Sequence, residues 1–140
     1  MSKDSRLGLL AAVGLFSGCT KKELQKIAPL TDIVVAKPGE VLAREGKPGE
    51  ELFVIASGSA RVTLRGDQIA TLYPGDAFGE MALLSRGPRS ATVTAQTPMT
   101  LYVLGPREFA TLLDDVPQVG RKILKAMASR LRRARTTPIV

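Results

Sequence analysis

The stretch Phe78–Ala95, FGEMALLSRGPRSATVTA, decides how the rest of the sequence is interpreted. A short helix-like piece, Met81–Leu84, interrupts a region of predicted strands, with Gly79-Glu80 before it and Arg89 after it. Gly79 lets the backbone approach a ligand, and the free N–H groups at the start of a helix attract an anion. Arg89 suits two phosphate oxygens, whereas Glu80 can only accept hydrogen bonds and suits hydroxyl groups. These residue types predict a site for a sugar phosphate.

Strand patterns surround this stretch on both sides. Short β-branched runs recur between turns that contain Gly or Pro, and we expect strands at Asp32–Ala36, Glu40–Arg44, Leu52–Ala56, Ala60–Leu64, Gln68–Leu72, Ala91–Ala95 and Leu101–Leu104. Turn signals at this short, regular spacing favour an antiparallel β-roll or jelly roll over alternating β-α-β units. Apolar and polar residues alternate from residue 60 to 65, as expected of a strand with one buried face.

Helical patterns flank the predicted strands. Thr20 is the expected N-cap of a helix in which Glu23 completes a capping box, and Pro29 marks the end of that helix. Pro106 is suited to the first turn of a later helix. A last helix is predicted over residues 119–135, stopped by Pro138, with an apolar stripe at Ile123, Leu124, Met127 and Leu131.

Length and composition bound the function. A chain of 140 residues suits one domain, divided here into a helical segment (1–31), a β-roll (32–105) and closing helices (106–135). The absence of His removes Ser-His and Cys-His nucleophile pairs and any metal cage built on His. The single cysteine, Cys19, forms no disulfide within the chain, and the acidic residues form no recognisable catalytic set. We therefore expect a protein that is not an enzyme and carries no metal or cofactor.

The excess positive charge lies at the C-terminus. Of the 20 Lys and Arg residues, the last 24 positions hold seven and no acid, which accounts for the net charge of +7: Arg121, Lys122, Lys125, Arg130, Arg132, Arg133 and Arg135. This basic face is either a solvated helix surface with Arg stems lying over apolar groups, or a docking surface for an acidic protein, anionic lipid or nucleic acid.

An apolar run near the N-terminus allows two interpretations. Leu7–Phe16 follows Lys3 and Arg6 and ends just before Cys19, as in a short lipoprotein export signal. Asp4 within the basic region argues against export, and ten apolar residues are too few to span a bilayer. We expect an amphipathic helix and a turn here, and a cytoplasmic protein.

The segment FGEMALL…PRSATV resembles the phosphate-binding cassette of cyclic nucleotide-binding domains, found in protein kinase A regulatory subunits, cyclic-nucleotide-gated channels and the bacterial cAMP receptor protein. Glycine-rich turns at residues 37–40 and 45–50, together with the helical patterns at both ends, extend the resemblance over nearly the whole chain. The resemblance implies the family's fold, a β-roll with N-terminal helices, an inserted short helix and closing C-terminal helices.

The resemblance also implies roles for residues of the cassette, which spans residues 78–91. Glu80 would accept from the ribose 2′-hydroxyl, and Arg89, nine residues later, would pair with the cyclic phosphate. The site as a whole would comprise Phe78, Gly79, Glu80, Met81, Ala82, Arg89, Ser90 and Ala91, with backbone N–H groups completing the phosphate cradle. Position 90 leaves the ligand open between cAMP, which we expect, and cGMP. The side chains that contact the purine are not identified by the motif.

The closing helices could act in further ways. In the family the last helix often folds over the bound base, so Arg130, Leu131 or Arg132 could form a lid, and the same helices could bind an effector protein or a second copy. The chain ends at Val140, and we expect no DNA-reading domain. The predicted function is cyclic nucleotide sensing coupled to the position of the C-terminal helices. The alternative is a ligand-independent interaction module acting through its basic C-terminal helix.

Overall fold

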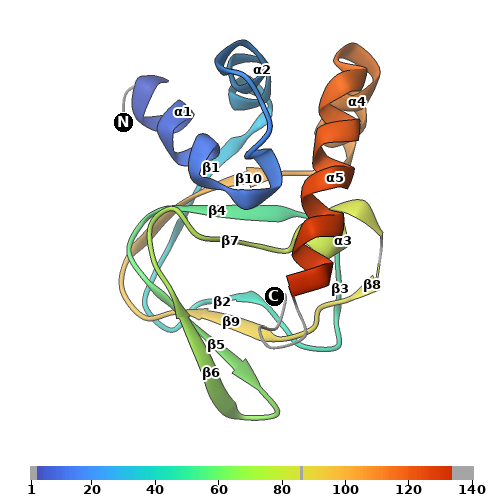
Figure 1. Cartoon of the computed structure of the whole chain (residues 1–140). Coiled ribbons are helices and arrows are strands. Elements are labelled where there is room, and N and C mark those ends of the chain that lie inside the picture. Colours follow the sequence, from blue (N-terminus) through green and yellow to red (C-terminus); the bar gives the residue numbers. More distant parts are fainter. Residues whose placement is uncertain (1–2, 86, 134–140) are drawn as a thin grey trace.

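Two four-stranded antiparallel sheets face each other below a layer of helices in the computed structural model, which describes residues 3–85 and 87–133 (Figure 1). One sheet has the strand order β1-β10-β4-β7 and the other has the order β2-β9-β5-β6, while β3 and β8 form a separate pair. The strands are β1 (Asp32–Ala36), β2 (Val41–Ala43), β3 (Pro48–Gly49), β4 (Leu52–Ser57), β5 (Ala60–Leu64), β6 (Asp67–Leu72), β7 (Ala77–Phe78), β8 (Gly87–Pro88), β9 (Thr92–Ala95) and β10 (Met99–Leu104). The predicted antiparallel β-roll is confirmed.

The helices lie before, within and after the strands. They are α1 (Lys3–Ala12), α2 (Lys21–Ile27), α3 (Glu80–Leu84), α4 (Pro106–Asp115) and α5 (Pro117–Arg133), with short 3-10 turns η1 (Gly14–Phe16) and η2 (Ala28–Leu30). In Figure 1 the blue N-terminal helices and the orange and red C-terminal helices cover the same side of the β1-β10-β4-β7 sheet. None of the helices in the described ranges is long and apolar enough to cross a bilayer.

Strand β4 separates two hydrophobic cores. Leu52, Val54 and Ala56 face the helices, whereas Phe53 and Ile55 face the interior of the roll. Successive strand residues point to opposite faces, so a strand covered on both sides is buried at every position from 52 to 56. This arrangement ties the helical layer and the roll to the same central strand.

The N-terminal segment forms the expected helix and turn. Leu7 and Leu10 of α1 and Phe16 of η1 are buried in the core under the helices. The Thr20 hydroxyl accepts from the Glu23 N–H and the Glu23 carboxylate accepts from the Thr20 N–H, which confirms the predicted capping box of α2. The α-helix ends at Ile27, and Pro29 lies in the 3-10 turn that follows.

The predicted apolar stripe of the last helix is wrong at two positions. Ile123 and Met127 are buried, but the side chains of Leu124 and Leu131 are 64% and 51% exposed. Successive helix residues are turned by about 100°. Because the face that contacts the body runs through Val119, Ile123 and Met127, both leucines point away from it. Arg135 and Pro138, where the helix was expected to end, lie outside the described residues.

Two of the seven predicted strands, Asp32–Ala36 and Ala60–Leu64, have the observed bounds, and the other five differ by one or two residues at an end. The expected strand Glu40–Arg44 is shortened to β2, and the turn expected over Gly46–Glu50 contains β3. Strand β3 exists because Pro48 pairs with Pro88, forty residues later, and local sequence patterns do not report such a pairing. This small ladder places Arg89 at the edge of the roll.

Candidate functional site

The backbone of Arg89 is held on both sides by the loop before β3. Its N–H donates to the Lys47 carbonyl at 2.8 Å, and its carbonyl accepts from the Gly46 N–H at 2.9 Å. These bonds continue the β3–β8 ladder and fix the direction in which the side chain leaves the loop. The site thus depends on a pairing between segments about forty residues apart.

Two glycines make room for the Arg89 side chain. A Cβ atom at Gly49 or at Gly79 would overlap the guanidinium group, so neither position accepts a side chain without displacing it. Gly79 also has φ of +88° at the N-cap of α3, a left-handed conformation that glycine adopts without steric cost. Both glycines are therefore required for the observed position of this arginine.

The guanidinium group of Arg89 is half-buried, next to a backbone carbonyl group and an aromatic ring. Its Nη1 donates to the Glu51 carbonyl at 3.1 Å, and its Cζ lies 5.7 Å from the centre of the Phe53 ring. Burial lowers the pKa of Arg89, and the nearby Glu51 carboxylate opposes this shift. A cation held in this way gains from an anionic partner, since a charge removed from water is stabilised by a paired charge.

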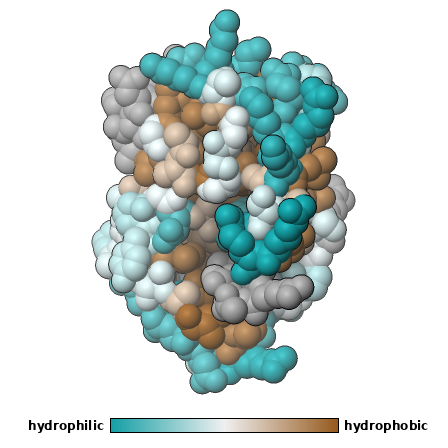
Figure 2. All heavy atoms as spheres, in the orientation of Figure 1, coloured by the Kyte–Doolittle hydropathy of each residue, from teal (hydrophilic) through white to brown (hydrophobic). Residues whose placement is uncertain are grey.

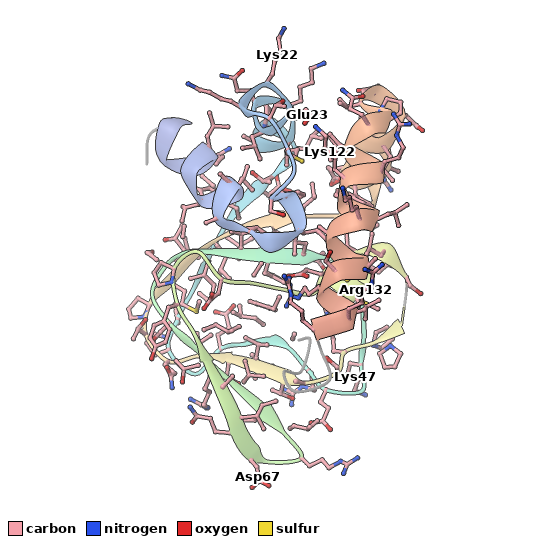
Figure 3. All side chains as sticks on the ribbon, in the orientation of Figure 1. Lys22, Glu23, Lys47, Asp67, Lys122 and Arg132 are labelled. Carbon is pink, nitrogen blue, oxygen red and sulfur yellow. The ribbon has the colours of Figure 1, made fainter. Side chains whose placement is uncertain are left out.

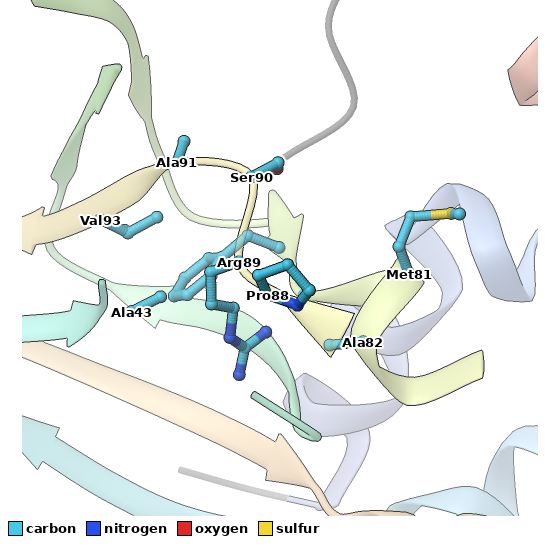
Figure 4. A pocket seen from close by; sticks show the side chains of 10 residues that line it. Ala43, Met81, Ala82, Pro88, Arg89, Ser90, Ala91 and Val93 are labelled. Carbon is cyan, nitrogen blue, oxygen red and sulfur yellow. The ribbon is translucent and has the colours of Figure 1, made fainter. Parts of the chain in front are cut away.

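Arg89 borders a small hollow of about 100 Å³, shown in Figure 4. Its walls come from the cassette and from the facing strands β2 and β9, and they are Ala43, Phe78, Gly79, Met81, Ala82, Pro88, Arg89, Ser90, Ala91 and Val93. The Phe78 ring stacks on Phe53, with ring centres 4.8 Å apart, and both rings belong to the hydrophobic core inside the roll. The hollow thus combines apolar walls with one cation.

Glu80, the first residue of α3, lies next to this hollow but does not line it. Its carboxylate is buried, with 1% of the side chain exposed, and both of its oxygens accept from Nη1 of Arg130 on α5. Burial raises the pKa of the Glu80 carboxyl group, and the Arg130 charge opposes the rise. The acceptor atoms predicted to bind a hydroxyl group are therefore occupied by a cation from the closing helix.

Glu80 and Arg130 line a second hollow of about 340 Å³. The remaining walls come from the segment between α1 and η1, from β6 and from the β6–β7 connection: Ala12, Val13, Gly14, Ile69, Ala70, Leu72, Gly75, Asp76 and Ala77. Most of these side chains are apolar. The consecutive residues Gly79 and Glu80 line different hollows, so the start of α3 borders both.

Most of the predicted site residues lie together. Seven of the eight line the first hollow and Glu80 lines the second, together with Arg130 from the predicted lid. Leu131 and Arg132 are exposed on α5 and line neither hollow. Their role over a bound base stays a prediction.

Sequence reasoning missed the apolar walls and one glycine. The predicted strand Gln68–Leu72 was assigned no buried face, so the contribution of Ile69 and Leu72 to a hollow was not apparent. Gly49 was read only as a turn residue, and no local signal connects it with Arg89. Among the residues that the structure describes, no three His, Cys, Asp or Glu side chains gather as metal ligands would.

Comparison with known proteins agrees with this geometry. Residues 33–116 match the family described as "Cyclic nucleotide-binding domain". A cAMP-dependent protein kinase regulatory subunit of Yarrowia lipolytica is 40% identical over 111 residues, which are 78% of this chain and 30% of that subunit. The chain thus spans less than a third of the length of this curated relative.

Solved structures resemble the chain over most of its length. The N-terminal domain of a transcriptional regulator from Streptomyces coelicolor A3(2) superposes with a TM-score of 0.82 at 29% identity, covering 92% of this chain and 96% of that one. The regulatory domain of Toxoplasma gondii PKA, crystallised with cAMP, has a TM-score of 0.72 at 32% identity and covers 81% of this chain and 45% of that one. With residues 33–116 matched to the family, this chain belongs to the cyclic nucleotide-binding domain family.

Proposed function

We propose that this chain is a regulatory module that binds a cyclic nucleotide, with cAMP as the expected ligand and cGMP as the alternative. The observation that carries the proposal is the half-buried Arg89 guanidinium beside an apolar hollow, held in a passage that two glycines keep open. A cyclic phosphate is a monoanion with two free oxygens, which matches the two-pronged donor geometry of a guanidinium group. The relative crystallised with cAMP supports this choice.

The volumes and walls of the two hollows suggest which part of the nucleotide each one holds. Small-molecule pockets usually measure about 300–1,000 Å³, so the first hollow, at about 100 Å³, holds a phosphate but not a whole nucleotide. The second hollow, at about 340 Å³, has the apolar walls that a purine requires. Glu80 lies at the start of α3, which borders both hollows, and the ribose would contact it when phosphate and base occupy the two hollows. The ligand then runs from Arg89, past Glu80, to the side chains of Ile69 and Leu72.

Coupling to the closing helices follows from the bond between Glu80 and Arg130. A ribose hydroxyl that donates to Glu80 competes with Arg130 for the same carboxylate oxygens, because those oxygens already accept from the guanidinium group. Leu83 of α3 belongs to the same hydrophobic core as Met127 of α5, so a shift of the short helix is transmitted by packing as well. Ligand contacts that differ between two positions of α5 shift the equilibrium between those positions.

Calorimetric titration with cAMP and with cGMP tests the binding proposal. Replacing Arg89 by Ala is expected to cost about 2–5 kcal/mol of binding, a loss of roughly thirtyfold or more in affinity. Arg107→Ala, on the exposed surface of α4, removes the same charge far from both hollows and serves as the matched control. An Arg89→Ala variant that binds cAMP as tightly as the control variant would rule out the proposal.

The role of Glu80 has its own test. Glu80→Gln is expected to weaken cAMP binding less than Arg89→Ala and to reduce the preference for cAMP over 2′-deoxy-cAMP, because the ribose hydroxyl loses a charged acceptor. Amide hydrogen exchange over residues 117–133, measured with and without cAMP, tests the coupling to α5. Identical protection with and without cAMP would show that binding does not change the attachment of α5.

A further inference from the structure

A groove of about 610 Å³ lies between the segment of residues 14–18, which contains η1, and one face of α5, and it shares only Gly14 with the hollows of the nucleotide site. In Figure 1 the blue turn that follows α1 lies beside the red helix α5. Its lining residues come only from these two segments: Gly14, Ser17, Gly18, Lys122, Lys125, Ala126, Ser129 and Arg133. The groove therefore lies on the basic surface of α5, and the proposed nucleotide binding does not use its cations.

The groove is positively charged. Three cations and two hydroxyl groups line it, and no carboxylate does so. The Lys122 ammonium group is 2.5 Å from the Glu23 carboxylate, and its stem lies against Gly18 (Figure 3). No described residue forms an ion pair with Lys125 or Arg133, and both side chains are exposed. Hydrophilic side chains accordingly gather over the lower half of α5 in Figure 2. An anionic partner complements this surface.

The shape of the groove and the faces of α5 limit the kind of anion. No large apolar side chain lines the groove, and Leu124 and Leu131 point away from it, so a lipid surface would find charge in the groove but nothing apolar to insert there. The lining contains no aromatic side chain on which the bases of a single-stranded nucleic acid would stack. A concave, polar channel between two backbone segments is suited instead to an extended peptide.

The spacing of the cations agrees with the repeat of an extended chain. Lys125 and Arg133 are eight residues apart on a helix that rises about 1.5 Å per residue, a separation of about 12 Å along the axis. Side chains on one face of an extended peptide repeat every two residues, about 6.6 Å, so carboxylates at positions i and i+4 are about 13 Å apart. We propose that the groove between η1 and α5 binds an extended acidic peptide segment of a partner protein, with carboxylates at i and i+4 paired to Lys125 and Arg133.

The experiment uses short synthetic peptides and the full chain. Two peptides of the same composition carry two Glu residues among Gly and Ser, at i and i+4 in one and at i and i+3 in the other, which places the second pair on opposite faces of an extended chain. Binding is followed by nuclear magnetic resonance chemical-shift titration at about 50 mM salt, where screening leaves ion pairs measurable. The i+4 peptide is expected to bind several-fold more tightly and to shift the amide signals of residues 14–18 and 122–133.

Charge-matched variants separate the groove from general attraction. Lys125→Ala with Arg133→Ala is expected to weaken binding of the i+4 peptide about tenfold, the effect of losing two partly shielded ion pairs. Arg107→Ala with Arg121→Ala removes two exposed arginines from α4 and α5 that do not line the groove, and is expected to change affinity less than twofold. All four side chains are exposed, and thermal unfolding checks that both double variants remain folded.

Three results would overturn the proposal. They are equal weakening in the two double variants, equal affinity for the two peptides, and tighter binding of oligothymidylate or phosphatidylserine vesicles than of the i+4 peptide. The groove variants are expected to bind cAMP as the unmodified chain does, because neither residue lines the nucleotide hollows. Failure of the groove proposal and failure of the nucleotide proposal are therefore distinguished by separate titrations.

Discussion

Within residues 3–85 and 87–133, two ion pairs connect α5 to the other elements, and they differ in how the protein shifts the pKa of the carboxylate. Lys122 pairs with Glu23 of α2, and Arg130 pairs with Glu80 of α3. The hydrogen bond from Lys122 and the one from the Thr20 N–H lower the pKa of Glu23. Burial, by contrast, raises the pKa of Glu80 although Arg130 opposes the shift.

This difference indicates which of the two ion pairs a ligand could replace. The charged form of Glu23 is stabilised by two donors, one of which belongs to its own helix cap, so this pair holds the first half of α5 in place. Among the described residues Glu80 has a single cationic partner, Arg130, and its side chain is 1% exposed, so its charged form is costly to maintain. In the proposed function a ligand hydroxyl group donates to this carboxylate. We therefore expect the C-terminal half of α5 to be the part whose attachment responds to ligand.

Loss of the buried pair is expected to have the largest effect. Arg130→Ala leaves the Glu80 carboxylate buried without its cation, and we expect the free energy of unfolding at pH 7 to fall by about 2–3 kcal/mol. This is less than for a fully buried pair, because 29% of the Arg130 side chain is exposed. Urea unfolding measures the change. An effect no larger than that of Lys122→Ala would show that the two pairs are equivalent.

The pH dependence of stability should have opposite signs at the two carboxylates. The pKa of Glu80 is raised, so the folded state binds its proton more tightly than the unfolded state, and stability falls as the pH rises above about 4.5. The pKa of Glu23 is lowered, so its contribution is present above about 4.5 and is lost as the pH falls below that value. Each slope is at most about 1.4 kcal/mol per pH unit.

Unfolding of Glu80→Gln and Glu23→Gln over a pH series measures these contributions. Relative to the unmodified chain, Glu80→Gln should lose the decrease above pH 4.5 and Glu23→Gln the decrease below it. The contribution of each carboxylate is the difference in unfolding free energy between the unmodified chain and the variant. If the two differences changed with pH in the same direction, the assignment of Glu23 as an anchor and Glu80 as exchangeable would be wrong.

The helix cap supports the Glu23 pair and should have an intermediate effect. Thr20→Ala removes the hydroxyl group that accepts from the Glu23 N–H, at an expected cost of about 1 kcal/mol of stability. Thr20→Ser keeps that acceptor and serves as the control, with an expected change of a few tenths of a kcal/mol. A cap variant that leaves thermal stability unchanged would show that α5 alone holds Glu23.

The smallest effect is expected at Lys122. Its ammonium group is partly exposed and screened by salt, so Lys122→Ala should cost about 0.5 kcal/mol, within the range of surface pairs. The cost should decrease at high salt, unlike the larger cost at Arg130. Denaturant unfolding at low and high ionic strength tests the difference, and equal salt dependence at the two positions would contradict it.

Local patterns in the sequence determined much of the fold and the chemistry of the site. Alternation and turn residues predicted the strands of the roll, and Thr20 and Glu23 predicted a helix cap. The residue types Gly79, Glu80 and Arg89 around the short helix predicted a sugar-phosphate site, and that role stays a prediction. These features depend on residues near one another in the sequence, where backbone preference and side-chain spacing act directly.

Only the tertiary structure decided the partners of those residues. Arg130 reaches Glu80 from 50 positions away, and the passage for Arg89 requires Gly49, forty residues before it. The exposure of Leu124 and Leu131 likewise depends on which face of α5 docks against the body. The physical reason is that burial and ion pairing are set by how distant segments pack together, and the period of a single helix or strand does not specify that packing.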